Sequence, residues 1–259
     1  MCGQIGVIFG AKHRTRDEID YLTWLFTRVL ELSEERGPYA TGVAWLNRDG
    51  EHRLFKKVVP ASEFIRDKAF GEVLGTIDNS VTVLLGHTRW PTRGNPACVD
   101  DAQPKRAGRI LATHNGTVTN ADWLFQRFGL PRHAEVDSEV IFRFADESID
   151  ADGRLNLHAL AGRMALCKGS VAAVMVAKTD PERVVMIRGT NPLEMMYSPR
   201  YRAVLYASDM DYIRHAVGDE TGWVEAAIPR GALVAVGTDP LEIAEAVRVE
   251  RKVISAVCL

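Results

Sequence analysis

The stretch MCGQIGVIF (residues 1–9) decides the fold. Residues 2–9 are apolar and interrupted by glycine, which is typical of a buried strand. Methionine is normally removed when the next side chain is small, and removal of Met1 would leave a thiol and a free α-amine on Cys2. Their ordinary pKa values are about 8.5 and about 7.7–8.0, so one residue would carry a nucleophile and a base. Alone, a Met-Cys-Gly start is a weak indicator.

Two later segments supply groups that such a thiol needs. GHTRWPTRG (residues 86–94) follows an apolar strand, and the guanidinium of Arg89 can hold a carboxylate through two hydrogen bonds. HNG (residues 114–116) also follows an apolar strand and offers an amide donor beside the backbone N–H of Gly116. Two such donors are what an oxyanion hole requires. Taken singly, Arg89 also fits a surface ion pair, and residues 114–116 also fit a turn.

A third segment, VDSE (residues 136–139), places a carboxylate at the start of a predicted helix. Asp137 can bind a substrate ammonium there or cap the helix. No single segment decides between an active site and ordinary structure. The alternatives of a surface ion pair, a turn and a helix cap do not explain why all of these segments occur together after an N-terminal Cys-Gly.

Composition excludes several classes of partner. The 259 residues are 46% hydrophobic and carry a net charge of -2, with 32 basic and 34 acidic residues. No polybasic block supports nucleic-acid or membrane-surface binding. The N-terminus lacks the regions of a signal peptide, and no apolar run approaches the roughly 20 residues that span a bilayer. We therefore expect a soluble cytoplasmic protein.

The four cysteines lie far apart and form no Cys-x-x-Cys pair. This spacing argues against a structural zinc site and a disulfide framework, so we predict no metal and no cofactor. Cys167 follows the pattern of a helix face and is predicted to lie in the core. Cys98 and Cys258 are predicted to be inert thiols.

Periodicity predicts an α+β chain. A capping box of Thr15 and Glu18 starts a helix that ends at Gly37-Pro38, and Asn120 is the expected N-cap of another. Further helices are predicted near 62–74, after Asp137, over 157–164 and near 209–217, and strands at 41–46, 53–59, 81–87, 110–114, 171–177, 183–188, 193–197, 203–207, 223–228 and 231–236. Strands in runs with helices grouped between them favour antiparallel sheets. No linker or repeat divides the chain, so residues 1–259 are predicted to be one domain.

The ordered set of motifs resembles the glutaminase domain of class II glutamine amidotransferases. The family includes glucosamine-phosphate synthase and amidophosphoribosyltransferase. The resemblance runs from Cys2 to roughly residue 240. It rests on Cys2-Gly3, GHTRW (86–90), DAQP (101–104), HNG (114–116) and DSE (137–139), with later support from GSVA (169–172), RGTNPL (188–193) and ASD (207–209).

The resemblance implies the N-terminal-nucleophile (Ntn) hydrolase fold, a four-layer αββα sandwich of two antiparallel sheets between helical layers. It also implies that Cys2 attacks the side-chain amide of L-glutamine while its α-amine shuttles the proton. The side chain of Asn115 and the backbone N–H of Gly116 would then stabilise the oxyanion. Ammonia would leave, and water would hydrolyse the glutamyl thioester.

The resemblance also assigns the substrate-binding residues. Arg89 would hold the α-carboxylate of glutamine, and Asp137 its α-ammonium. Trp90 and Thr92 match positions on a loop that closes over glutamine.

Two departures leave the subfamily open. Many members read Arg-Gly-x-Asp-Ser-x-Gly where this chain has RGPYATG (residues 36–42), which lacks the acidic residue. Asp101 stands where the family has asparagine. Neither departure changes a residue assigned above.

Three functions remain open on the sequence. The resemblance leaves no room for the synthase domain that family members usually carry, so the ammonia would pass to a separate synthase partner. Alternatively, the chain is a stand-alone amidase that cleaves a γ-glutamyl or related amide without transfer. A non-catalytic regulatory or scaffold relative is the alternative of another class.

Overall fold

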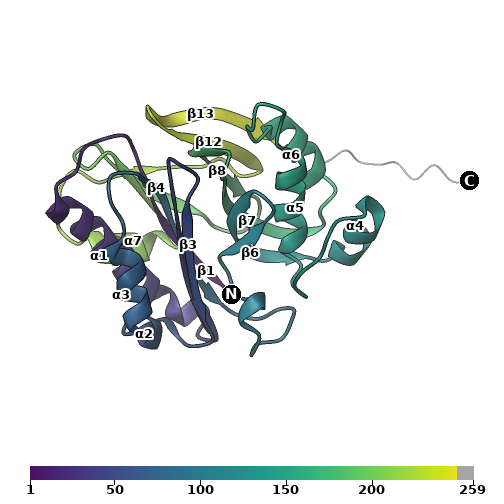
Figure 1. Ribbon diagram of the computed structural model, residues 1–259, viewed down its shortest axis with the longest axis horizontal. Coiled ribbons are helices and arrows are strands. Elements are labelled where there is room, and N and C mark those ends of the chain that lie inside the picture. Colours follow the sequence, from purple (N-terminus) through teal and green to yellow (C-terminus); the bar gives the residue numbers. More distant parts are fainter. Residues whose placement is uncertain (250–259) are drawn as a thin grey trace, which may run out of the picture.

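The computed structural model describes residues 1–249, which contain strands and helices in alternating groups (Figure 1). The strands are β1 (Gly3–Phe9), β2 (Ala40–Asn47), β3 (His52–Lys57), β4 (Val81–Arg89), β5 (Lys105–Ala107), β6 (Ile110–Val118), β7 (Gly169–Ala177), β8 (Asp180–Arg188), β9 (Glu194–Ser198), β10 (Ala203–Ala207), β11 (Val224–Ala226), β12 (Ala232–Thr238) and β13 (Leu241–Arg248). The α-helices are α1 (Arg16–Leu32), α2 (Ala61–Phe64), α3 (Lys68–Gly75), α4 (Ala121–Phe128), α5 (Glu139–Glu147), α6 (Leu157–Met164) and α7 (Met210–Val217), with two short 3₁₀ helices at Ser33–Arg36 and Val99–Asp101.

The strands form two sheets. The first has the order β11-β9-β10-β1-β4-β2-β3, and the second β13-β12-β8-β7-β6-β5. The neighbouring strands in both sheets pair antiparallel, as the sequence predicted. β1 lies in the interior of the first sheet, between β10 and β4. The residue that precedes β1 is therefore held at a fixed point of the fold.

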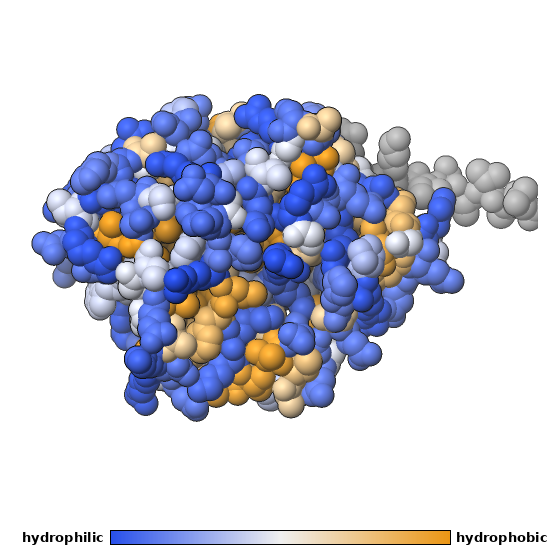
Figure 2. All heavy atoms as spheres, in the orientation of Figure 1, coloured by the Kyte–Doolittle hydropathy of each residue, from blue (hydrophilic) through white to orange (hydrophobic). Residues whose placement is uncertain are grey.

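The fold has four layers, and one apolar cluster lies between each pair of neighbouring layers. Helices α1, α2, α3 and α7 pack on the outer face of the first sheet, and α4, α5 and α6 on the outer face of the second. A third cluster fills the space between the two sheets. Figure 1 shows the helices on either side of the strands, and Figure 2 shows a mostly hydrophilic surface with hydrophobic residues in separate patches. The arrangement is the αββα sandwich that the family resemblance implied.

The sequence explains why β1 is buried on both faces. Ile5, Val7 and Phe9 belong to the outer cluster, whereas Ile8 belongs to the cluster between the sheets. A strand buried on both faces is continuously apolar rather than alternating. Gly6 is needed because a Cβ there would lie 2.3 Å from the phenol oxygen of Tyr206.

Most predicted elements are present with shifted ends. The capping box of Thr15 and Glu18 is formed, and α1 is followed by a 3₁₀ turn before Gly37. The strand predicted at 110–114 continues to Val118. The single helix predicted over 62–74 is wrong, because Asp67 caps a second helix by accepting from the N–H of Ala69.

Other expectations need correction. β5 and β13 were not predicted, and β11 is shorter than the strand predicted at 223–228. Asn120 occupies the N-cap position, but its side chain bonds to the backbone of Leu166 and Lys168 instead of the helix. Cys167 is buried as predicted, although it follows α6 rather than belonging to it.

Two points concern the limits of the described chain. No helix among residues 1–249 is long and apolar enough to cross a membrane. Cys258 lies outside the described residues, so its predicted inertness is untested.

Candidate active site

Cys2 lies where β1 begins and β4 ends. Antiparallel pairing places Gly3 opposite Thr88, so Cys2 lies beside Arg89 and Trp90, the two residues that follow Thr88. The backbone N–H of Trp90 donates to the Cys2 sulfur (N···S 3.2 Å), and the thiol donates to the Trp90 carbonyl (3.3 Å). The sulfur is therefore held by backbone groups of one residue.

The thiol environment favours the protonated form. Burial raises the pKa of the Cys2 thiol, and the nearby carboxylate of Asp137 adds to the rise. The N–H of Trp90, the amino terminus and the guanidinium of Arg89 oppose it. A nucleophile in this state needs a base to take its proton.

Asn115 and Gly116 lie near the end of β6, beside Cys2. The side-chain Nδ2 of Asn115 donates to the Cys2 carbonyl (2.9 Å) and to Oγ of Ser208 (2.6 Å). The same Cys2 carbonyl accepts from Nε of Arg36 (3.0 Å). Gly116 has φ +136°, and a Cβ there would lie 2.0 Å from the Ser170 carbonyl oxygen. Only glycine fits this position without strain.

Arg89 ends β4, and its side chain is only 4% exposed. It donates to the backbone carbonyls of Arg93 and Asn95, both at 3.0 Å. Its Nη2 lies 4.0 Å from a carboxylate oxygen of Asp101. In this structure the guanidinium is therefore bonded to the chain that follows it.

Asp137 is buried and lies before α5. The N-cap of α5 is Ser138, and neither residue caps the helix through its side chain. Instead, the Asp137 carboxylate accepts from the backbone N–H of Val118 at the end of β6. The capping alternative raised by the sequence is therefore wrong.

These residues meet at one small cavity of about 20 Å³, roughly the space that one water molecule needs. Of the seven residues predicted for the site, six line this cavity: Cys2, Arg89, Trp90, Thr92, Gly116 and Asp137. The seventh, Asn115, reaches it through the carbonyl of Cys2. At the entrance, Trp90 is 43% exposed and packs edge-to-face on Tyr39, with ring centroids 5.3 Å apart.

Two buried histidines, His87 and His114, lie next to each other, and His114 lines the cavity. Nε2 of His87 donates to the carbonyl of His114 (3.2 Å), which places the proton on Nε2. Burial lowers the pKa of His87 to about 3, and burial also lowers that of His114. Both imidazoles are therefore neutral at pH 7.

Several residues of the site were not predicted. Oγ of Ser208 accepts from the backbone N–H of Gln4 (2.7 Å) as well as from Asn115. The side chain of Gln103 bonds to both the N–H and the carbonyl of His114. Ser208 and Gln103 lie in motifs that carried the resemblance, but nothing in the sequence indicated that they hold the backbone around the nucleophile.

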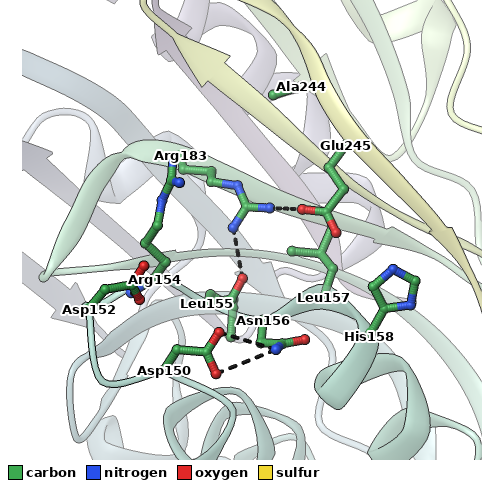
Figure 3. Close-up of a pocket in the computed structure, with 10 residues that line it drawn as sticks. All are labelled: Asp150, Asp152, Arg154, Leu155, Asn156, Leu157, His158, Arg183, Ala244 and Glu245. Atoms are coloured by element: carbon green, nitrogen blue, oxygen red, sulfur yellow. Dashed lines mark hydrogen bonds and ion pairs between the residues drawn. The ribbon is translucent and has the colours of Figure 1, made fainter.

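Larger cavities lie elsewhere. One of about 400 Å³ lies between α6 and β13, where Arg183 pairs with Glu245 and Asn156 bonds to Asp150 (Figure 3). Another, of about 460 Å³, lies near the ends of β7 and β8 and includes Cys167. Burial raises the pKa of the Cys167 thiol to about 12, so that thiol is a poor nucleophile. Within residues 1–249, no group of three or more His, Cys, Asp or Glu side chains is arranged to hold a metal ion.

Known proteins resemble both the sequence and the fold. No protein-family model matches the chain. It is 27% identical over 216 residues to 7-cyano-7-deazaguanine synthase of Saccharolobus solfataricus, covering 82% of this chain and 44% of that protein. It is 31% identical over 204 residues to glutamine–fructose-6-phosphate aminotransferase (isomerizing) of Haemophilus ducreyi, covering 76% of this chain and 30% of that protein.

Among solved structures, glutamine phosphoribosylpyrophosphate amidotransferase of B. subtilis superposes with a TM-score of 0.66 at 17% identity. The match covers 97% of this chain and 50% of that one. The chain therefore spans half or less of the length of the proteins named here.

Proposed function

The chain belongs to the class II glutamine amidotransferases, and from this premise we propose that it hydrolyses the side-chain amide of L-glutamine through a thioester on Cys2. The observation that carries the proposal is the single cavity that joins the Cys2 thiol to a buried guanidinium and a buried carboxylate. An α-amino acid presents the opposite charges, a carboxylate and an ammonium. Arg89 and Asp137 are complementary to these two groups.

The proposed reaction starts from the protonated thiol. Because burial raises the pKa of Cys2, a base must accept the proton as sulfur attacks the amide carbon. Once Met1 has been removed, the α-amine of Cys2 is that base, since its ordinary pKa of about 7.7–8.0 lies close to neutral pH. The same proton then passes to the departing nitrogen, which leaves as ammonia. Water hydrolyses the thioester to glutamate and restores the thiol.

Two donors near the sulfur are proposed to stabilise the tetrahedral oxyanion. They are Nδ2 of Asn115 and the backbone N–H of Gly116. Both Nδ2 hydrogens already have partners, the Cys2 carbonyl and Ser208. Asn115 therefore has to exchange one partner for the oxyanion during the reaction.

Glutamine binding requires the segment after β4 to move. The cavity of about 20 Å³ admits about one water molecule, and the Arg89 guanidinium bonds to the carbonyls of residues 93 and 95. We propose that glutamine displaces these carbonyls, so that its carboxylate takes their place on Arg89. Trp90 and Thr92 then cover the bound substrate.

The ammonia acceptor is proposed to be a separate synthase. The named relatives are a synthase and an aminotransferase that are more than twice as long as the matched region. A stand-alone amidase would instead run at full rate by itself. Measuring ammonia release from glutamine with and without co-purifying proteins separates the two, because only a transferring subunit gains rate from its partner.

The catalytic proposal is tested by ammonia release together with intact-mass measurement. Active protein should lack Met1, and Cys2→Ala should release no ammonia yet still bind glutamine, because the thiol contributes little to ground-state affinity. Protein that retains Met1 and still turns over at full rate would show that the α-amine is not the base. A Cys2→Ala variant with wild-type turnover would identify a non-catalytic role for this residue.

A further inference from the structure

Asp101 is a buried carboxylate at the centre of the segments that surround the cavity. Its side chain is 5% exposed. One oxygen accepts from the backbone N–H of Asn95 (2.7 Å), and the other accepts from the backbone N–H of Glu135 (3.2 Å). A carboxylate bonded to two backbone donors fixes the segments to which they belong.

The first of these segments is bonded to Arg89. Residues 93 and 95 supply the carbonyls that accept from the guanidinium. Between them, Gly94 has φ +82°, and a Cβ there would lie 2.5 Å from the Asp101 carboxylate and 3.3 Å from Nη2 of Arg89. Asp101, Gly94 and Arg89 are therefore in close contact, and a side chain at position 94 does not fit.

The second segment leads to Asp137. Glu135 lies two residues before it, and the neighbouring N–H groups of His133 and Ala134 are held by the carboxylate of Glu139. Asp101 is thus the one described side chain that bonds to both the 93–95 segment and the 133–137 segment. Its two oxygens connect the surroundings of the guanidinium with those of the second carboxylate.

We propose that Asp101 is a positioning residue that sets the spacing between Arg89 and Asp137, and thereby the specificity for the charged α-amino-acid end of the substrate. The inference rests on the proposed function, since it takes these two residues as the binders of carboxylate and ammonium. Asp101 itself touches neither the thiol nor the reacting amide. Its removal should therefore affect recognition of the amino-acid end more than the chemical step.

If Asp101 acted only through its charge, its removal would lower the KM for glutamine. A carboxylate 4.0 Å from Arg89 competes with the substrate carboxylate, so its neutralisation would strengthen glutamine binding by this route. The two bonds to backbone N–H groups are shorter than this distance, and no hydrogen bond joins Asp101 to Arg89 among the described residues. Positioning therefore outweighs charge competition, and the KM for glutamine is expected to rise.

The test compares Asp101→Ala with Asp146→Ala, because asparagine is the residue that the family carries at position 101. Alanine at this position removes both acceptors of the backbone N–H groups of Asn95 and Glu135. Asp146 is the control, because its carboxylate likewise accepts from a backbone N–H, that of Arg109, and lies away from the cavity. Turnover of glutamine gives kcat and KM. The rate at which iodoacetamide alkylates Cys2, measured on the Cys2 peptide by mass spectrometry, gives the reactivity of the thiol. Iodoacetamide carries no α-carboxylate or α-ammonium, so this rate does not depend on recognition of the amino-acid end.

The expected result for Asp101→Ala is a KM for glutamine raised about tenfold or more, because release of both segments weakens the charge-assisted bonds that Arg89 and Asp137 are proposed to make with the substrate. Its kcat and its Cys2 alkylation rate should stay within about threefold of wild type. The control should match wild type in all three. A KM that is unchanged or lower in Asp101→Ala overturns the inference, as does a parallel loss of kcat, alkylation and folded protein. Absence of glutamine turnover in the wild-type protein would overturn the proposed function, and this inference with it.

Discussion

At the scale of single residues, the site combines groups with different partners and different exposure. Arg89 and Asp137 are buried and bonded to backbone groups, whereas Trp90 is exposed at the entrance. Asn115 bonds to the backbone of the nucleophile itself. Each contact suggests which kinetic constant a substitution should change.

Replacing Asn115 by alanine should slow the chemical step. The oxygen that Asn115 is proposed to contact becomes fully anionic only in the tetrahedral intermediate, so ground-state binding should change little. We expect kcat to fall by about 10²–10³, in line with loss of one oxyanion donor. Measuring kcat, the Kd for glutamine and the melting temperature of this variant decides the role. An unstable variant with near-normal turnover per folded molecule would instead assign Asn115 to structure.

Replacing Arg89 by lysine should raise KM for glutamine steeply. Loss of a buried charge-assisted pair costs about 2–5 kcal/mol, and an ammonium does not reproduce the two parallel bonds of a guanidinium. Lysine should therefore rescue little relative to Arg89→Ala, as steady-state kinetics of both variants will reveal. Equal KM values in Arg89→Ala and wild type would show that a residue other than Arg89 binds the α-carboxylate.

The sequence indicated which residues meet, but not their bonding partners. Cys2, Arg89, Gly116 and Asp137 were selected from ordered motifs, and they line one cavity. The bonds of the Arg89 guanidinium to the carbonyls of residues 93 and 95 were not predicted, because they depend on a local loop path. Asp101 was noted only as a departure from the family pattern, since its two backbone donors are separated by 40 residues.

At the scale of elements, strand ends carry the site and helices stabilise it from outside. β1, β4 and β6 contribute their ends to the cavity, and α1 packs on the outer face of the first sheet. The long elements were predictable, because their periodicity extends over many residues. β5 has three residues, too few to show any period, and β13 begins Leu-Glu-Ile-Ala-Glu, in which two adjacent apolar residues interrupt the alternation that marks a strand.

Replacing Thr15 by alanine should destabilise α1 without changing the rate of glutamine hydrolysis. Its side chain accepts from the N–H of Glu18, and the Glu18 carboxylate accepts from the N–H of Thr15. Loss of an N-cap costs about 1 kcal/mol of the free energy of unfolding, and kcat should stay at the wild-type value. Urea denaturation measures the loss. Thr27→Ala is the control, because Thr27 lies within the same helix and bonds back to Thr23; an equal loss in both variants would exclude a capping effect.

At the scale of the whole molecule, two sheets share one buried layer, and neutral histidines lie within it. Residues from Ile8 to Val236 contribute to this layer. That residues 1–259 form one domain stays a prediction. His87 and His114 are buried near the same interface, and the nearby Asp137 carboxylate only partly offsets the effect of burial, which lowers the pKa of His114. Protonation of these two side chains at low pH should therefore destabilise the packing of the two sheets.

The free energy of unfolding should fall as the pH drops below about 6.5, the ordinary pKa of histidine. Between that pH and the folded pKa of about 3 for His87, the unfolded chain binds a proton that the folded chain does not. Each pH unit then costs about 1.4 kcal/mol, and His114 acts in the same direction. Urea titrations from pH 7.5 to 4.5 measure the slope. The slope should be shallower in His87→Gln, which keeps a donor for the His114 carbonyl; identical slopes in the two proteins would contradict this assignment.

The interior position of β1 has a consequence for the order of events during synthesis. The backbone N–H of Gln4 reaches a serine 204 residues later in the chain, and contacts so distant in sequence are expected to form late. At 5–20 residues per second, a ribosome needs roughly 10–40 s to deliver that partner. During this interval β1 can pair with β4 but lacks its other neighbour, β10. A processing aminopeptidase would therefore meet Met1 on a partly assembled sheet, and the nucleophile would be uncovered before the catalytic pocket is complete.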